Sequence, residues 1–122
     1  MNNASPAILT VVDDDESVLG ALTFLFEMEG FDVRAYRDGE DLLAEPHLPV
    51  SGCMIIDYKL PGVNGLDMLG RLRRRGVCLP AVLITTPTPT VLALAAAANV
   101  PVVAKPNLDR VLLETVRGLL TS

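Results

Sequence analysis

The chain has 122 residues, which suits one domain with a core of its own. Half of the residues are hydrophobic but only 4% are aromatic, so the core must be built from Leu, Val, Ile and Ala. Lys and Arg number 10 against 15 Asp and Glu, and the resulting formal charge of −5 argues against general affinity for nucleic acid or for an anionic membrane.

No targeting signal or redox motif stands out in the sequence. The N-terminus, MNNASPA, lacks the basic and apolar regions of a signal peptide, and no apolar run approaches the ~20 residues of a membrane span. We therefore expect a cytoplasmic protein with one domain over residues 1–122. Cys53 and Cys78 lie in apolar runs without a CxxC motif, so we expect both to be buried free thiols.

Strand-like and helix-like segments alternate along the chain, which predicts a parallel, doubly wound α/β sheet with right-handed crossovers. Asp15 is the predicted N-cap of the first helix and Gly30 its C′ residue. The segment 31–36 alternates like a half-exposed edge strand. The predicted strands are 7–12, 31–36, 52–57, 79–85 and 100–104, and the later predicted helices are 38–45, 65–75, 91–98 and 108–120.

The third predicted helix ends in four arginines, at positions 71, 73, 74 and 75. Cations in a last helical turn complement the helix dipole and add solubility. We favour that interpretation over a phosphate-binding site.

Polar side chains follow four of the predicted strands. They are Asp13 and Asp14, Asp57, Thr85 and Lys105. The carboxyl ends of parallel strands share one edge of the sheet, which is where open α/β sheets bind ligands. Asp57 is central, because it ends a short apolar run and precedes the turn signals Pro-Gly and Asn-Gly. We therefore expect these side chains to form one site.

This set of residues suits phosphoryl transfer to a carboxylate. Aspartates at neighbouring strand ends repel each other unless a cation lies between them, and hard oxygen ligands suit Mg²⁺ or Mn²⁺. Lys105 adds a positive charge that can pair with Asp57 or with phosphoryl oxygens, and Thr85 can donate a hydrogen bond. Asp57 is then the nucleophile. The sequence has no Gly-rich phosphate loop, so the donor should be an already phosphorylated molecule.

Four motifs in this order and spacing, VVDDDESV, IIDYKLPGVNG, VLIT and VVAKP, resemble the receiver domain of two-component response regulators over essentially the whole chain. The resemblance implies a flavodoxin-like fold with five strands in the order 2-1-3-4-5. It implies that Asp57 takes a phosphoryl group from a histidine kinase or phosphotransfer protein. Such a domain is not a dedicated enzyme, and catalyses only its own phosphorylation from a phosphodonor and slow autodephosphorylation.

The same resemblance assigns the other site residues. Asp14 would be a direct Mg²⁺ ligand, Asp13 a ligand directly or through water, and the backbone carbonyl of Lys59 a third protein ligand beside Asp57. Thr85 and Lys105 would hold the phosphoryl oxygens. The peptide bond between Lys105 and Pro106 would be cis.

The segment from Thr85 to Lys105 departs from the receiver pattern. Val102 stands where receivers usually carry Tyr or Phe, and the segment is about two residues short, so we expect a shortened or irregular fourth helix. No charged residue occurs from position 77 to 104, and the helix predicted at 91–98 is apolar all round. Either this helix packs closely on the sheet, or helix four and strand five expose an apolar face for self-association or a partner.

Three other functions are weaker matches. A receiver-like interaction module that works without phosphorylation fits Val102 but not the complete set of site residues. A haloacid dehalogenase-type hydrolase needs a second Asp two residues after the nucleophile, where this chain has Lys59. A flavin-binding protein would need aromatic residues to flank the flavin ring, and the sequence has no Trp and only two Tyr. The chain is either a single-domain regulator that acts through protein contacts or a fragment of a longer protein.

Overall fold

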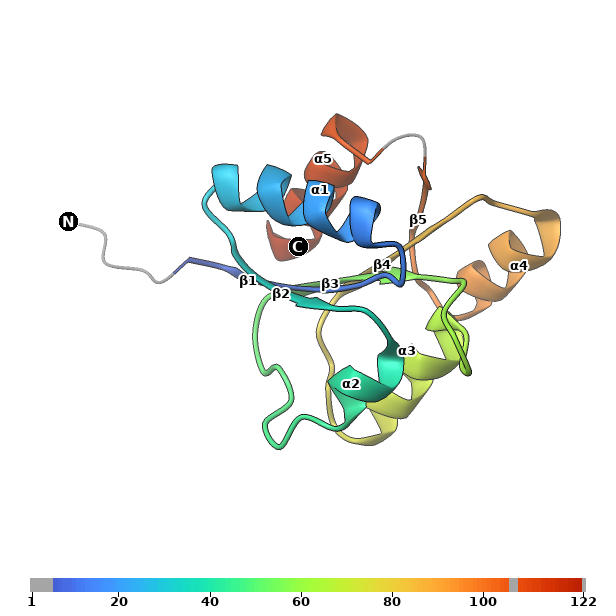
Figure 1. Cartoon of the computed structure of the whole chain (residues 1–122). Coiled ribbons are helices and arrows are strands. Elements are labelled where there is room, and N and C mark those ends of the chain that lie inside the picture. The colour runs from blue at the N-terminus through green and yellow to red at the C-terminus, as the bar shows by residue number, and fades with distance from the viewer. Residues whose placement is uncertain (1–5, 106–107, 122) are drawn as a thin grey trace.

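A computed structural model, described for residues 6–105 and 108–121, shows a five-stranded parallel sheet in the order β2-β1-β3-β4-β5 with helices on both faces (Figure 1). Both the doubly wound fold and the strand order are as predicted. The elements are β1 (Ile8–Val12), α1 (Glu16–Met28), β2 (Asp32–Tyr36), α2 (Gly39–Leu43), β3 (Cys53–Asp57), α3 (Gly65–Arg74), β4 (Ala81–Thr85), α4 (Pro89–Ala97), β5 (Val102–Ala104) and α5 (Arg110–Thr121).

The sheet separates two apolar clusters. Side chains of a strand alternate between its faces, so Cys53 and Ile55 of β3 pack with α1 and α5, while Met54 and Ile56 pack with α2, α3 and α4. All five residues of β3 and of β4 are buried, as central parallel strands require. Figure 1 shows α1 and α5 on one side of the sheet and α2 and α3 on the other. Apolar packing on both faces of the sheet therefore fixes the position of β3 and of Asp57 at its end.

The ends of α1 and the place of β2 agree with the sequence. The carboxylate of Asp15 accepts hydrogen bonds from the backbone amides of Ser17 and Val18, at 2.9 and 3.3 Å. Gly30 has a φ of 91°, the left-handed conformation typical of a C′ glycine. β2 lies at the sheet edge and is partly exposed, as its alternation predicts.

Two element boundaries near α4 differ from the prediction, for local reasons. α4 begins two residues earlier, because the side chain of Thr88 caps it and Pro89 suits the first helical turn. β5 begins at Val102 rather than at position 100. The turn that ends α4 still includes Asn99, with a φ of 59°, and Val100, whose amide donates to the carbonyl of Ala95. α4 itself is a regular helix of 9 residues.

The prediction that both cysteines are buried is wrong for one of them. Cys53 is buried in β3, and burial raises the pKa of its thiol to about 11. Cys78 is exposed, because it belongs to the loop between α3 and β4 and not to the strand. Its neighbour Val77 takes the buried position in that loop.

Two other expectations concern the membrane and a cis bond. Within residues 6–105 and 108–121, no helix combines the length and apolar character needed to cross a bilayer. The expected cis bond before Pro106 falls on a residue outside the described part of the chain.

Candidate functional site

Three carboxylates gather at the carboxyl edge of the sheet. Val12, the last residue of β1, pairs with Ile56 of β3. Asp13, which follows β1, and Asp57, which ends β3, therefore meet at the sheet edge. One oxygen from each of Asp13, Asp14 and Asp57 lies within 4.8 Å of the others. Asp13 and Asp57 are buried and Asp14 is exposed, so the cluster opens to solvent on one side.

The turn between β3 and α3 fixes the carboxylate of Asp57. The backbone amide of Lys59 donates to Oδ1 of Asp57 at 3.2 Å. The amide of Gly65 donates to the carbonyl of Tyr58 at 2.8 Å, which closes the turn. A Cβ at position 65 would lie 2.3 Å from the carbonyl oxygen of Asp57, so this close approach requires glycine.

Lys105 joins the cluster from the end of β5. Its Nζ lies 3.0 Å from Oδ2 of Asp57 and 3.5 Å from Oδ2 of Asp13. Partial burial on its own would lower the pKa of Lys105, but the hydrogen bond with Asp57 and the negative charges of Asp13 and Asp57 outweigh it and raise the pKa. The lysine therefore brings a stable positive charge to the three carboxylates.

Asp13 is the carboxylate of the site whose charge is least compensated by its surroundings. Its Oδ1 accepts a hydrogen bond from the backbone amide of Asp15 at 2.9 Å. Its buried Oδ2 has no hydrogen-bond partner within the described chain, and only the 3.5 Å ion pair with Lys105. Burial raises the pKa of Asp13 to about 6, and the charge of Asp57 adds to the rise, whereas the Asp15 amide and Lys105 oppose it.

This donor set fits a divalent cation. Carboxylate oxygens are the ligands that Mg²⁺ and Mn²⁺ prefer, and a cation would satisfy the orphaned Oδ2 of Asp13. It would also offset the repulsion between Asp13 and Asp57 that helps to raise the pKa of Asp13. Asp13, Asp14 and Asp57 are therefore the side chains that could hold such an ion.

The remaining predicted residues are placed less directly. Thr85 is buried at the end of β4, and its hydroxyl donates to the carbonyl of Thr86 at 3.4 Å rather than to Asp57. Val102 is half-buried in β5 and packs against the cluster that includes Val91 of α4. The role of the Lys59 carbonyl stays a prediction.

Sequence reasoning missed two contacts that organise the site. One is the hydrogen bond from the Asp15 amide to Asp13, which makes the start of α1 part of the site. An Asp two residues before a helix N-cap is a recognisable Asx-turn signal for it. The other is the contact between Lys105 and Asp13, for which the sequence offers no signal.

Divalent metal is expected to stabilise the fold, because an ion that binds the native carboxylates and not the unfolded chain shifts the equilibrium by mass action. Mg²⁺ at about 100 times its Kd should add about 2.7 kcal/mol, which thermal unfolding followed by circular dichroism would detect as a higher Tm. Asp14→Asn should lose most of this rise. Asp41→Asn, at an exposed carboxyl on α2, is the matched control. An equal rise in the Asp14 and Asp41 variants would exclude Asp14 as a ligand.

The comparison with known families and proteins agrees with this geometry. The family model described as "Response regulator receiver domain" matches residues 9–117. Nodulation protein W of Bradyrhizobium diazoefficiens is 32% identical over 115 residues, which cover 93% of this chain and 51% of that protein. Transcriptional regulatory protein FixJ of Rhizobium meliloti is 30% identical over 108 residues, which cover 87% of this chain and 53% of that protein. The chain thus spans about half the length of these relatives.

Solved structures show the same fold over nearly the whole chain. A putative response regulator from Chloroflexus aurantiacus superposes with a TM-score of 0.86 at 26% identity, covering 96% of this chain and 99% of that one. A CheY-like receiver domain protein from Methanospirillum hungatei gives 0.86 at 23% identity, covering 96% and 95%. The chain therefore belongs to the response regulator receiver domain family of two-component systems.

Proposed function

We propose that the carboxylate of Asp57 accepts a phosphoryl group, from a phosphohistidine of a histidine kinase or phosphotransfer protein and from small phosphodonors. The convergence of Asp13, Asp14, Asp57 and Lys105 at one edge of the sheet carries this proposal. In the transfer, a carboxylate oxygen of Asp57 bonds to phosphorus as the P–N bond to the donor histidine breaks. The product is an acyl phosphate and a free imidazole.

The neighbouring residues have separate parts in this step. Asp13, Asp14 and the carbonyl of Lys59 would hold Mg²⁺ beside Asp57, and a bound Mg²⁺ supplies positive charge to the phosphoryl oxygens. Lys105 pairs with Asp57 at rest and with a phosphoryl oxygen afterwards. Thr85 would exchange its long hydrogen bond to Thr86 for one to another phosphoryl oxygen. Self-phosphorylation and slow autodephosphorylation are the only reactions that the domain would catalyse.

Incubation with phosphoramidate tests the proposal without a cognate kinase. The wild type should gain one phosphoryl group in Mg²⁺, measured by intact mass, because the site already places its carboxylates and lysine together. In excess EDTA the gain should fall at least about tenfold, since two carboxylates and a phosphoryl group would face each other without the cation. Absence of any gain in Mg²⁺, from phosphoramidate and acetyl phosphate alike, would contradict the proposal.

A receiver-like module that works without phosphorylation is the second candidate. Val102 favours it, because a small aliphatic side chain replaces the aromatic residue that resemblance to receivers leads one to expect. The phosphoramidate experiment separates the two, since only the first candidate requires a covalent product.

The receiver domain over residues 1–122 would signal through contacts with other proteins and would not itself bind nucleic acid directly. Its cytoplasmic location stays a prediction.

Phosphorylation of Asp57 would change how the exposed surface of α4 associates with other proteins. Only Val91 and Ala95 of this helix are buried, while Leu92 and Leu94 are 47% and 48% exposed. Residues 86–90, which form the loop after Thr85 and the first residues of α4, are all exposed. The face that helix four shares with strand five would therefore be an association surface for a second copy or a partner, and not only a packing surface.

Leu94→Glu is expected to block association through this face and to leave phosphorylation intact. A charge on the exposed apolar surface opposes its burial in an interface. Position 94 belongs to α4, which contributes no residue to the carboxylate cluster or to its ion pairs with Lys105. Sedimentation velocity with and without beryllofluoride should show a larger species only for the activated wild type. Val111→Glu, at a 44% exposed valine of α5, is the matched control. If Leu94→Glu sediments like wild type in both states, α4 is not the interface.

A further inference from the structure

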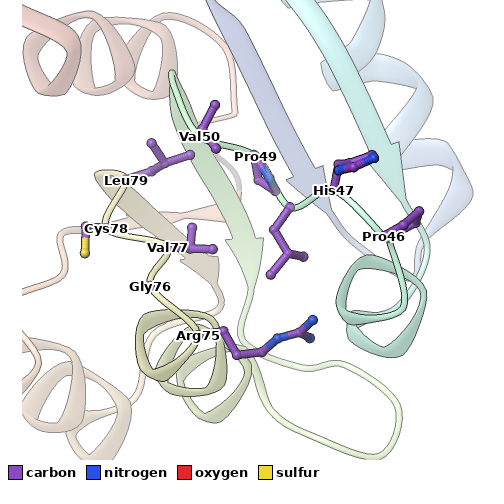
Figure 2. Close-up of a pocket in the computed structure, with 10 residues that line it drawn as sticks. Pro46, His47, Pro49, Val50, Arg75, Gly76, Val77, Cys78 and Leu79 are labelled. Atoms are coloured by element: carbon purple, nitrogen blue, oxygen red, sulfur yellow. The ribbon is translucent and has the colours of Figure 1, made fainter.

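A cavity of about 640 Å³ lies at the opposite edge of the sheet from Asp57. Two loops form it, residues 46–50 before β3 and residues 75–79 before β4. Figure 2 shows these loops facing each other, with Pro49 and His47 on one side and Val77 and Leu79 on the other. Apolar side chains thus form much of the wall.

A second cavity, of about 480 Å³, shares one residue with the first. It lies between the C-terminal ends of α2 and α3 and is lined by Arg75 together with Leu43, Ala44, Arg71, Arg74 and Glu40. Because Arg75 lines both cavities, we treat them as one surface feature. We call it the basic groove, defined by the lining residues 40, 43–44, 46–50, 71 and 74–79.

The groove concentrates positive charge on an acidic protein. Three of the chain's 10 basic residues, Arg71, Arg74 and Arg75, line it. Arg71 forms an ion pair with Glu40 at 3.5 Å, whereas Arg74 and Arg75 have no ion-pair partner among the described residues. Arg75 donates a hydrogen bond to the carbonyl of Leu43 at 2.8 Å. A helix C-terminus corresponds to about half a negative charge, so dipole compensation alone does not account for the three arginines in the groove.

An exposed apolar residue stands at the edge of the same groove. Val50 is 90% exposed, and it lines the cavity with Leu48 and Leu79. The phosphates of a polyanion such as nucleic acid would gain no favourable contact with these apolar walls. The net charge of −5 would also repel it. Apolar walls next to unpaired guanidinium groups instead match a peptide that carries both apolar and acidic side chains.

We propose that the basic groove is a docking site for an acidic segment of a partner protein. An aliphatic or aromatic side chain of that segment fills the cavity beside Val50, and its carboxylates pair with Arg74 and Arg75. The groove and Asp57 lie at opposite edges of the sheet, so docking does not require phosphorylation. The groove can therefore bind a partner protein whether or not Asp57 is phosphorylated.

Phage-displayed random dodecapeptides, panned on the wild type, provide the test. The double variant Arg74→Ser/Arg75→Ser serves for counter-selection. Enriched peptides should combine Asp or Glu with Leu, Ile or Phe. Their affinity for the wild type, measured by fluorescence anisotropy, should fall about tenfold in the double variant and by a similar factor in Val50→Glu, since each exposed charge pair contributes modestly. It should also weaken as salt is added.

The matched control removes the same amount of charge elsewhere. Arg110→Ser/Arg117→Ser, both on α5, should change the affinity less than about twofold. Beryllofluoride and Asp57→Asn should leave it unchanged, so failure of this proposal is distinguishable from failure of phosphorylation. The proposal is overturned if no acidic peptides are enriched, if they bind the groove variants as well as the wild type, or if labelled duplex DNA binds the arginines in their place.

Discussion

Replacement of Asp57 by asparagine is expected to abolish phosphoryl incorporation and to leave the fold intact. The amide of asparagine cannot form the acyl phosphate. In the described part of the chain, no other carboxylate combines the contact to Lys105 with a place at the end of the central strand. The amide oxygen can still accept from the backbone of Lys59, so the β3–α3 turn should survive. Phosphoramidate in Mg²⁺ should add one group to wild type and none to Asp57→Asn, by intact mass.

A matched variant guards against a general loss of reactivity. Asp41→Asn removes an exposed carboxyl of α2 and should be phosphorylated to the same extent as wild type. Equal incorporation into Asp57→Asn and Asp41→Asn would show that the acceptor lies elsewhere.

Asp13→Asn is expected to stabilise the metal-free protein. The environment of Asp13 disfavours its charged form, and the difference between a pKa of about 6 and the ordinary 3.8 corresponds to roughly 3 kcal/mol. The neutral amide would keep a hydrogen bond to Asp15 but lose the ion pair with Lys105, so a net gain of about 1–2 kcal/mol is expected. Thermal unfolding in EDTA at neutral pH should show a Tm higher by about 5 °C.

The pH dependence of this gain follows from the direction of the shift. Because the native state holds the Asp13 proton more tightly than the unfolded chain, ionisation costs stability, and the cost grows as the pH rises from about 4 to about 6. The advantage of Asp13→Asn should therefore be full above pH 6 and small near pH 4. Urea unfolding of both proteins at pH 7.5 and pH 4.5 measures it.

Magnesium should reverse the order of these two proteins. A cation stabilises the ionised Asp13, so wild type should gain stability on addition of Mg²⁺ while Asp13→Asn gains less. A metal-free Asp13→Asn that is less stable than wild type at pH 7.5 would contradict the view that Asp13 is an uncompensated charge.

The sequence predicts the carboxyl edge of the sheet well, because parallel strands bring their ends together whatever the detailed packing. The apolar run before Asp57 and the strand order therefore suffice to place it near Asp13. The Asp15–Asp13 hydrogen bond and the double contact of Lys105 depend on side-chain conformation, which periodicity does not encode. The same holds for Thr85: its place at the end of β4 is predictable, but the hydrogen bond from its hydroxyl to the carbonyl of Thr86 is not.

Errors arose where apolar runs extended past the ends of elements. Cys78 lies in such a run before β4, but Pro80 and the turn after α3 keep it out of the strand and exposed. The apolar residues from 100 onward likewise include a helix-ending turn closed by Val100 and Ala95. The uniform hydrophobicity of α4 left two alternatives open in the sequence. The alternatives were a helix packed closely on the sheet and a helix with an exposed apolar face. In the structure only Val91 and Ala95 of α4 are buried, so the rest of the helix leaves apolar side chains exposed.

Chemical mapping of the acceptor tests the central claim most directly. Borohydride reduces an acyl phosphate to an alcohol and leaves free carboxylates untouched, so a phosphorylated aspartate becomes homoserine. After phosphoramidate and Mg²⁺, reduction and trypsin digestion, the peptide 38–59 should carry homoserine at position 57, as read by fragment-ion mass spectrometry. Homoserine at another aspartate, or a phosphorylated protein that yields none at position 57, would contradict the account.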